Sequence, residues 1–254
     1  MRTAGLAVAS KESMNNTQIT LAVNEIYDTP TFQGEGKNLG MPCYFLRLAG
    51  CNLACSWCDT PYAWDWKGVN GKAYDIREEL HPLHVSDVVD TLERQGEETK
   101  IRNLVISGGE PMLQQAALST LIFALKTRGW WVEIETAGTR VPSPHNCADQ
   151  FTVSLKLANS GNDVKKRRIP DAIHAFAKDS RSVFKFVVSS LSDFDEIDML
   201  VRTYNLHPVY IMPEGKDENN INKHLQAVTV QALARGYYLT TRLQVLLYGN
   251  QRGV

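Results

Sequence analysis

The 254-residue sequence has almost no net charge, with 27 Lys and Arg residues against 28 Asp and Glu residues. It therefore lacks the basic excess that draws a protein to nucleic acid or to an anionic membrane surface. It also lacks any apolar run approaching the roughly 20 residues that a membrane-spanning helix needs. These absences predict a protein that binds neither nucleic acid nor a membrane, and we expect it in the cytoplasm.

The N-terminal segment lacks a periodic apolar pattern. Its apolar stretch, residues 4–9, is too short for the core of a signal peptide. We expect residues 1–20 to form a disordered tail and residues 21–254 to form a single domain. Met14 is an alternative start to Met1.

The sequence has only five cysteines, an odd number that suits a disulfide framework poorly. Cys43 and Cys147 are isolated, and we expect each to be an inert, buried, small apolar side chain. The other three, Cys51, Cys55 and Cys58, fall within eight residues of one another. This cluster is the strongest chemical signal in the sequence.

Strand-like and helix-like patterns alternate along the chain. The expected strands are residues 22–28, 44–49, 103–107, 131–135, 151–155, 183–188, 209–212 and 239–247, and the expected helices are residues 86–96, 114–128, 193–204 and 220–235. Strands separated by helices of this length predict parallel βαβ units and an α/β fold. About six units follow the first strand, so we predict a partial, open (βα)6 barrel with a mostly parallel sheet. Its chemistry should lie at the carboxyl ends of the strands. The basic run at residues 165–168 is predicted to be a solvated loop.

The cysteine cluster lies in the sequence GCNLACSWCDT, residues 50–60, directly after an expected strand. Structural zinc would need a fourth ligand and usually pairs two C-x2-C elements, and the sequence shows no second element. A [4Fe–4S] cluster ordinarily uses four cysteines. With three, one iron keeps an open position that can bind a ligand. We predict an iron–sulfur cluster, and a zinc-stabilised binding module is the non-enzyme alternative.

The C-x3-C-x2-C spacing closely resembles the radical S-adenosylmethionine (SAM) superfamily. The resemblance implies that SAM binds the open iron and that one electron from the reduced cluster cleaves SAM to a 5′-deoxyadenosyl radical. The sequence GGEP, residues 108–111, resembles the superfamily's motif for the SAM amine. Its glycines allow close approach of the backbone, and its carboxylate can accept hydrogen bonds from an ammonium group. A plain strand-to-helix turn is the simpler interpretation of this motif.

The residues around the cysteines narrow the resemblance to one family. TFQGEG at residues 31–36, RLAG at 47–50, CDT at 58–60 and QRGV at the C-terminus together resemble the 7-carboxy-7-deazaguanine synthase family, from about Val23 onward. The resemblance implies conversion of 6-carboxy-5,6,7,8-tetrahydropterin to 7-carboxy-7-deazaguanine with loss of ammonia. This reaction belongs to queuosine and 7-deazapurine biosynthesis, uses SAM catalytically and is assisted by Mg²⁺.

The resemblance also implies roles for individual residues. Besides the three cysteines, Glu35 and Arg47 would be catalytic. Pterin contacts are expected from Phe32, Gln33, Gly34, Glu35, Arg47, Ser107 and the carboxylate of Val254. SAM contacts are expected from Trp57, Cys58, Asp59, Gly109, Glu110, Glu135, Ser154, Leu155, Lys156, Met212, Pro213, Glu214 and Gly215. The hydroxyl of Thr60 would contact Mg²⁺, with substrate oxygens and waters completing the octahedron.

Side-chain chemistry agrees with several of these roles, although plainer interpretations remain. Gln33 and Glu35 offer acceptors to a heterocycle rich in N–H donors. The guanidinium of Arg47 fits a substrate carboxylate, whereas without the motif it would be an ordinary exposed strand residue. Glu135 is expected at SAM hydroxyls, or as a surface carboxylate.

Two departures from the family pattern affect the SAM side. Leu155 stands where the family commonly has proline, and Ala137 stands where it commonly has asparagine. The resemblance further implies a homodimer and a one-electron donor such as flavodoxin or ferredoxin. The alternative enzyme is a radical SAM activase that forms a glycyl radical on a partner protein, but such a protein gives no reason for the acceptors Gln33 and Glu35.

Overall fold

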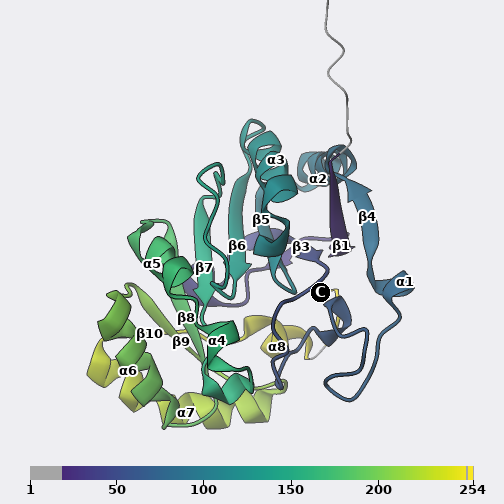
Figure 1. Ribbon diagram of the computed structural model, residues 1–254. Helices are drawn as coiled ribbons and strands as arrows, with labels where there is room; N and C mark the ends of the chain where they lie inside the picture. The colour runs from purple at the N-terminus through teal and green to yellow at the C-terminus, as the bar shows by residue number, and fades with distance from the viewer. Residues whose placement is uncertain (1–18, 250, 254) are drawn as a thin grey trace, which may run out of the picture.

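The computed structural model describes residues 19–249 and 251–253 (Figure 1). Most of the expected N-terminal tail and the terminal Val254 lie outside these residues. Within them, no helix is long and apolar enough to cross a membrane.

One sheet runs through the described residues, in the strand order β10-β9-β8-β7-β6-β5-β3-β1-β4, with β2 paired to β3. The strands are β1 (Thr20–Ile26), β2 (Thr31–Phe32), β3 (Pro42–Leu48), β4 (His81–His84), β5 (Asn103–Gly108), β6 (Trp131–Thr136), β7 (Gln150–Ser154), β8 (Ser182–Val188), β9 (Val209–Pro213) and β10 (Tyr238–Leu239). The pairs from β3–β5 through to β9–β10 are parallel, whereas β1 pairs antiparallel with β3 and β4, and β2 pairs antiparallel with β3. This confirms the predicted open, mostly parallel α/β fold.

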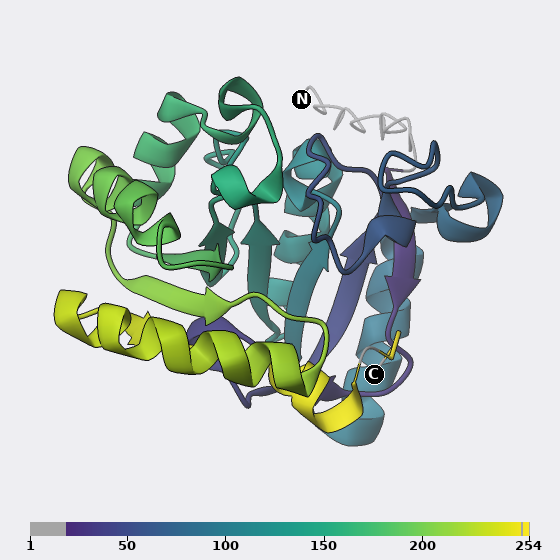
Figure 2. The same cartoon turned by 90° about the horizontal axis from the view of Figure 1, so that it is seen from below.

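Helices follow several of the strands and cover the sheet (Figure 1). They are α1 (Ile76–Glu79), α2 (Val85–Thr99), α3 (Gln115–Lys126), α4 (Val164–Arg167), α5 (Pro170–Lys178), α6 (Asp193–Tyr204), α7 (Glu218–Arg235) and α8 (Leu243–Tyr248). Figure 2 shows α7 along one border of the molecule, with α8 following it toward the C-terminus. The core forms between these helices and the sheet, and every residue of β8 is buried, as expected for a parallel strand covered on both faces.

The structure corrects two sequence predictions. The expected strand at residues 239–247 is only the two-residue strand β10 followed by helix α8, because the chain turns to dock on residues 34–36. There Thr240 accepts a hydrogen bond from the Gly36 amide, and the Leu243 amide donates to the Gly34 carbonyl. The basic run at residues 165–168 is not a solvated loop. It overlaps helix α4, and Arg167 is buried in an ion pair with Glu196.

The sequence motifs gather at one edge of the sheet. The cysteine loop follows the carboxyl end of β3, and Gly108 ends the neighbouring strand β5. The register of these two strands places Arg47 beside Ser107 and Leu48 beside Gly108. Because carboxyl ends of parallel strands share an edge, the loops that follow them surround a common space.

Candidate active site

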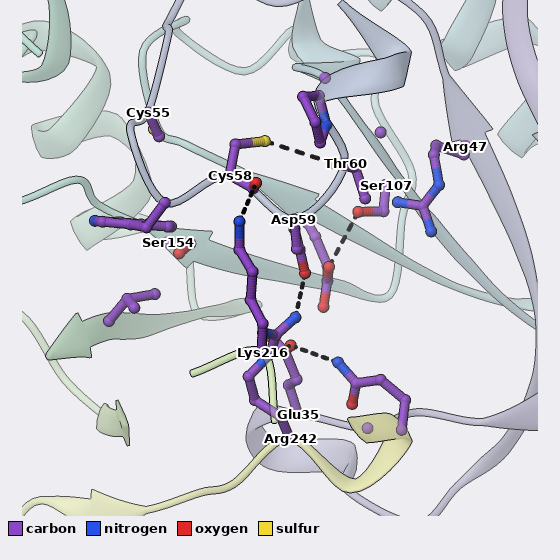
Figure 3. Close-up of a pocket in the computed structure, with 18 of the residues that line it drawn as sticks. Glu35, Arg47, Cys55, Cys58, Asp59, Thr60, Ser107, Ser154, Lys216 and Arg242 are labelled. Atoms are coloured by element: carbon purple, nitrogen blue, oxygen red, sulfur yellow. Dashed lines mark hydrogen bonds and ion pairs between the residues drawn. The ribbon is translucent and has the colours of Figure 1, made fainter. Parts of the chain in front are cut away.

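A cavity of about 590 Å³ lies at this edge (Figure 3). Most of the predicted site residues line it, namely Phe32, Gln33, Gly34, Glu35, Arg47, Cys51, Cys55, Trp57, Cys58, Asp59, Thr60, Ser107, Gly109, Glu135, Ser154, Lys156, Met212, Glu214 and Gly215. The cavity thus joins the cysteine loop to the QGEG stretch, which the sequence separates by the whole of β3.

The three cysteines form one wall of this cavity. Apolar side chains surround them, chiefly Leu53 and Ala137. Burial raises the pKa of the Cys51 thiol to about 12 and raises that of Cys55 as well. Such thiols lose their protons when a metal takes the proton's place. Three thiols from one loop, opening onto a roomy cavity, fit a [4Fe–4S] cluster with one iron facing the cavity. Among the described residues, no group of three His, Cys, Asp or Glu side chains is arranged to hold a single metal ion.

The turn after β5 holds the cysteine loop against the sheet. The Gly109 amide donates to the Leu48 carbonyl, and the Glu110 amide donates to the Gly50 carbonyl at 2.8 Å. A Cβ atom at Gly109 would lie 2.0 Å from the Gly50 carbonyl oxygen, which is backbone and cannot swing away. This position therefore has no room for a side chain, because the strand and the cysteine loop touch there.

The variant G109A should consequently displace the cysteine loop. We expect it to destabilise the protein by about 1–3 kcal/mol, the usual cost of overpacking, and to reduce iron loading. Urea unfolding and iron analysis measure the two effects. The matched variant G129A, at a turn where an added Cβ meets no atom within 4 Å, carries only the strain of its positive φ. Wild-type iron loading in G109A would contradict this account.

Three residues expected at SAM, namely Glu110, Leu155 and Pro213, are not among the residues that line the cavity. Glu110 is 0% exposed, and its carboxylate accepts hydrogen bonds from the Met112 amide, the Thr136 hydroxyl and the Ala137 amide. It ties the turn after β5 to the end of β6 instead of facing a ligand. Leu155 and Pro213 are buried, whereas the residues on either side of each, Ser154 and Lys156 and then Met212 and Glu214, line the cavity.

Glu35 lies in a cluster of buried charges (Figure 3). Its carboxylate pairs with Lys185 and with Arg242, and it accepts a 2.8 Å hydrogen bond from Gln244. Burial opposes ionisation of Glu35, but the charges of Lys185 and Arg242 outweigh it and lower its pKa to about 2. None of these three partners was identified from the sequence. The sequence could have indicated Lys185, because it is a charged residue in the middle of the mainly apolar strand β8. Nothing in the sequence marks Arg242 or Gln244.

The lowered pKa of Glu35 makes a prediction about acid stability. A carboxyl group with a depressed folded-state pKa stabilises the protein above its ordinary pKa of 4.5, and this contribution is lost as the pH falls toward 2. The contribution is roughly 3 kcal/mol at neutral pH. The difference in unfolding free energy between the cluster-free wild type and E35Q should therefore shrink as the pH falls from about 5 to about 3. A difference that does not change with pH would contradict the prediction.

Glu135 lines the cavity and contacts several of its other residues. Its carboxylate accepts hydrogen bonds from Gln33 at 3.2 Å and from Ser107 at 3.1 Å, and the Lys185 ammonium lies 3.8 Å away. These contacts gather Gln33, which directly follows β2, and residues of β5 and β8 around one carboxylate. Glu135 is therefore not a free surface carboxylate.

Arg47 is buried, not an exposed strand residue. Its Nε donates to Glu25 at 2.7 Å, and its Nη2 donates to the Tyr27 hydroxyl at 2.9 Å. Glu25 also pairs with Arg252 of the C-terminal segment, whose guanidinium stacks 3.9 Å from the centre of the Tyr62 ring. The C-terminal segment is thus held beside Arg47.

Residues close to the cysteines also line the cavity and contact one another there. Arg242 pairs with Asp59 and also donates to the Gly215 carbonyl, so it links the cysteine loop to the loop after β9. Lys156 donates to Ser154 and lies 5.7 Å from the centre of the Trp57 ring. The Thr60 hydroxyl lies 3.8 Å from the sulfur of Cys58.

Comparison with known proteins agrees with this geometry. The family model for the radical SAM superfamily matches residues 46–168. The 7-carboxy-7-deazaguanine synthase of Pyrobaculum aerophilum is 34% identical, over 88% of this chain and 93% of that protein. The enzyme of the same name from Rhodopirellula baltica is 32% identical, over 87% of this chain and 84% of that protein. The crystal structure of QueE from Escherichia coli superposes with a TM-score of 0.67 at 25% identity, covering 91% of this chain and 100% of that one.

Proposed function

We propose a reaction for this chain on the premise that it belongs to the 7-carboxy-7-deazaguanine synthase family of radical SAM enzymes. It converts 6-carboxy-5,6,7,8-tetrahydropterin to 7-carboxy-7-deazaguanine and ammonia. The observation that carries the proposal is the single cavity in which the cysteine loop meets Gln33, Glu35 and Arg47. When bound there, the [4Fe–4S] cluster and SAM supply the 5′-deoxyadenosyl radical that starts the reaction.

The pterin occupies the half of the cavity lined by Glu35, Arg47 and Ser107. Glu35 stays ionised at neutral pH, since its pKa is lowered to about 2, so it accepts hydrogen bonds from N–H groups of the heterocycle. Arg47 receives the substrate carboxylate, and its contacts with Glu25 and Tyr27 fix the direction of its guanidinium.

SAM occupies the other half, against the cysteines. The residues expected at SAM that line the cavity include Trp57, Asp59, Gly109, Ser154, Lys156, Met212, Glu214 and Gly215. Rigid placement matters because the radical must form beside the pterin and away from water. Thr60 also lines the cavity, and its hydroxyl would supply one ligand to Mg²⁺, with substrate oxygens and waters supplying the others.

We further propose that residues 21–254 act as one domain in a cytoplasmic homodimer, and that flavodoxin or ferredoxin delivers the electron. Support for a small-molecule substrate comes from the cavity, whose lining charges are already paired across it. A glycyl radical activase would need an opening for a protein loop instead.

Anaerobic turnover tests the proposal. The reconstituted protein, supplied with SAM, a one-electron reductant and Mg²⁺, should consume carboxytetrahydropterin and release carboxydeazaguanine, detected by mass spectrometry. Cleavage of SAM with unchanged pterin would overturn the substrate assignment. A glycyl radical on a co-purifying protein would favour the activase.

A further inference from the structure

Each of the three cysteine sulfurs accepts a hydrogen bond from an N–H group. The Leu53 amide donates to Cys51 at 3.4 Å, which is a contact within the loop itself. The other two donors are side chains outside the cysteine motif. Asn162 donates from Nδ2 to Cys55 at 3.2 Å, and Trp64 donates from Nε1 to Cys58 at 3.3 Å.

The direction of both side-chain bonds is fixed by chemistry. An indole nitrogen is a donor only, so Trp64 cannot act in the opposite sense. The amide of Asn162 could in principle be flipped. However, its Oδ1 already accepts the Ala54 amide hydrogen at 2.8 Å, which leaves Nδ2 toward the Cys55 sulfur.

Both donors are also held in place by the backbone around them. Trp64 follows a 3-10 turn (Pro61–Ala63), and the Ala63 carbonyl accepts the Gly50 amide at the start of the cysteine loop. Asn162 lies in the segment between β7 and α4, where the Ser160 carbonyl accepts the Ser56 amide. Two separate segments thus hydrogen-bond to the backbone of the cysteine loop, and each also donates one N–H group to a cysteine sulfur.

We infer that Asn162 and Trp64 tune the reduction potential of the [4Fe–4S] cluster upward. Reduction adds one negative charge to a cluster that three thiolates already make anionic. The positive end of an N–H dipole stabilises the reduced state more than the oxidised state, and hydrogen bonds to the sulfurs are among the factors that set such potentials. The two residues are positioning residues, because they act through the cysteines and not on SAM or pterin.

The variant W64F tests this inference, because phenylalanine retains an aromatic ring and removes the donor. Chain position 66 offers a matched control. The indole N–H of Trp66 is buried and has no hydrogen-bond partner among the described residues, and Trp66 does not line the cavity. W66F therefore removes the same group without removing a bond to sulfur.

The readout is a potentiometric titration of the anaerobically reconstituted protein, followed by the electron paramagnetic resonance signal of the reduced cluster. The titration requires neither SAM nor pterin. The inference about the reduction potential can therefore fail while the proposed function stands, and the proposed function can fail while the inference stands. At a fixed solution potential, W64F should show about a tenfold lower ratio of reduced to oxidised cluster, which corresponds to about 59 mV downward for a one-electron couple. W66F should titrate like the wild type.

A second variant addresses Cys55 independently. N162D retains the oxygen that accepts the Ala54 amide but replaces the donor with a negative charge, so its potential should fall further than that of W64F. Iron and sulfide contents are measured first, so that only fully loaded protein is compared. If N162D loads poorly, the potential of W64F alone tests the inference. Wild-type potentials in loaded W64F, or an equal shift in W66F, would overturn the inference.

Discussion

Replacing Lys185 with methionine is expected to destabilise the protein by about 3–5 kcal/mol, the usual cost of removing one partner from a buried ion pair. Lys185 is 4% exposed, and its ammonium pairs with Glu35 and lies 3.8 Å from Glu135. The carboxylates of Glu35, Glu135 and Glu133 raise its pKa despite burial, so it is a permanent cation. K185M would leave these acids in the sheet without their central counter-charge.

The loss of Lys185 should also alter the pH dependence. Without its charge, the pKa of Glu35 rises above about 2, so the acid-sensitive range of stability moves upward toward neutral pH. Pterin conversion should fall strongly, because Lys185 no longer holds the Glu35 carboxylate that accepts hydrogen bonds from the substrate. Urea unfolding at several pH values and the turnover assay measure these effects. K185R, which retains the charge, is the control, and wild-type stability in K185M would contradict the account.

The second large effect is expected at Arg242. This guanidinium is the only side chain among the described residues that pairs with both Asp59, next to the cysteine loop's last thiol, and Glu35, on the pterin side. It also donates to the carbonyl of Gly215 at 2.5 Å. Two charge-assisted hydrogen bonds contribute about 3 kcal/mol. We expect this loss to fall on the positioning of the substrates in the transition state, which lowers pterin conversion by about 100-fold.

The variant R242M should lose pterin conversion more strongly than SAM cleavage, because the residue connects the two halves without touching the cluster. The product and 5′-deoxyadenosine are quantified in the same reaction. R235M is the matched control, since Arg235 forms a comparable 2.9 Å ion pair with Asp198 on the helical surface and should leave the rate within twofold. Equal losses of both activities in R242M would show that Arg242 only supports the fold.

Local pattern was sufficient to predict the parallel strands. Strands such as β8 are buried on both faces, so their sequences are short apolar runs with clear ends. The cysteine loop and the glycines could be placed at the same edge because parallel strands align their carboxyl ends. Together with the family resemblance, this predicted half of the residues that line the cavity.

Contacts between distant segments could not be predicted in this way. The C-terminal segment was expected as a strand from its apolar composition, but its contacts with Gly34 and Gly36 bend it into β10, a turn and α8. The direction of the Glu110 side chain could not be predicted from the sequence either. A carboxylate at a strand end can face a ligand or cap the next turn, and only the positions of Met112 and Ala137 decide between them.

The number of pterin molecules converted for each SAM molecule cleaved tests the central claim most directly. Our account holds that one cavity brings cluster-bound SAM and the pterin together, and that SAM is used catalytically. The wild type should therefore release several molecules of 7-carboxy-7-deazaguanine for each 5′-deoxyadenosine that accumulates. Accumulation of 5′-deoxyadenosine while the pterin remains unchanged would contradict the account.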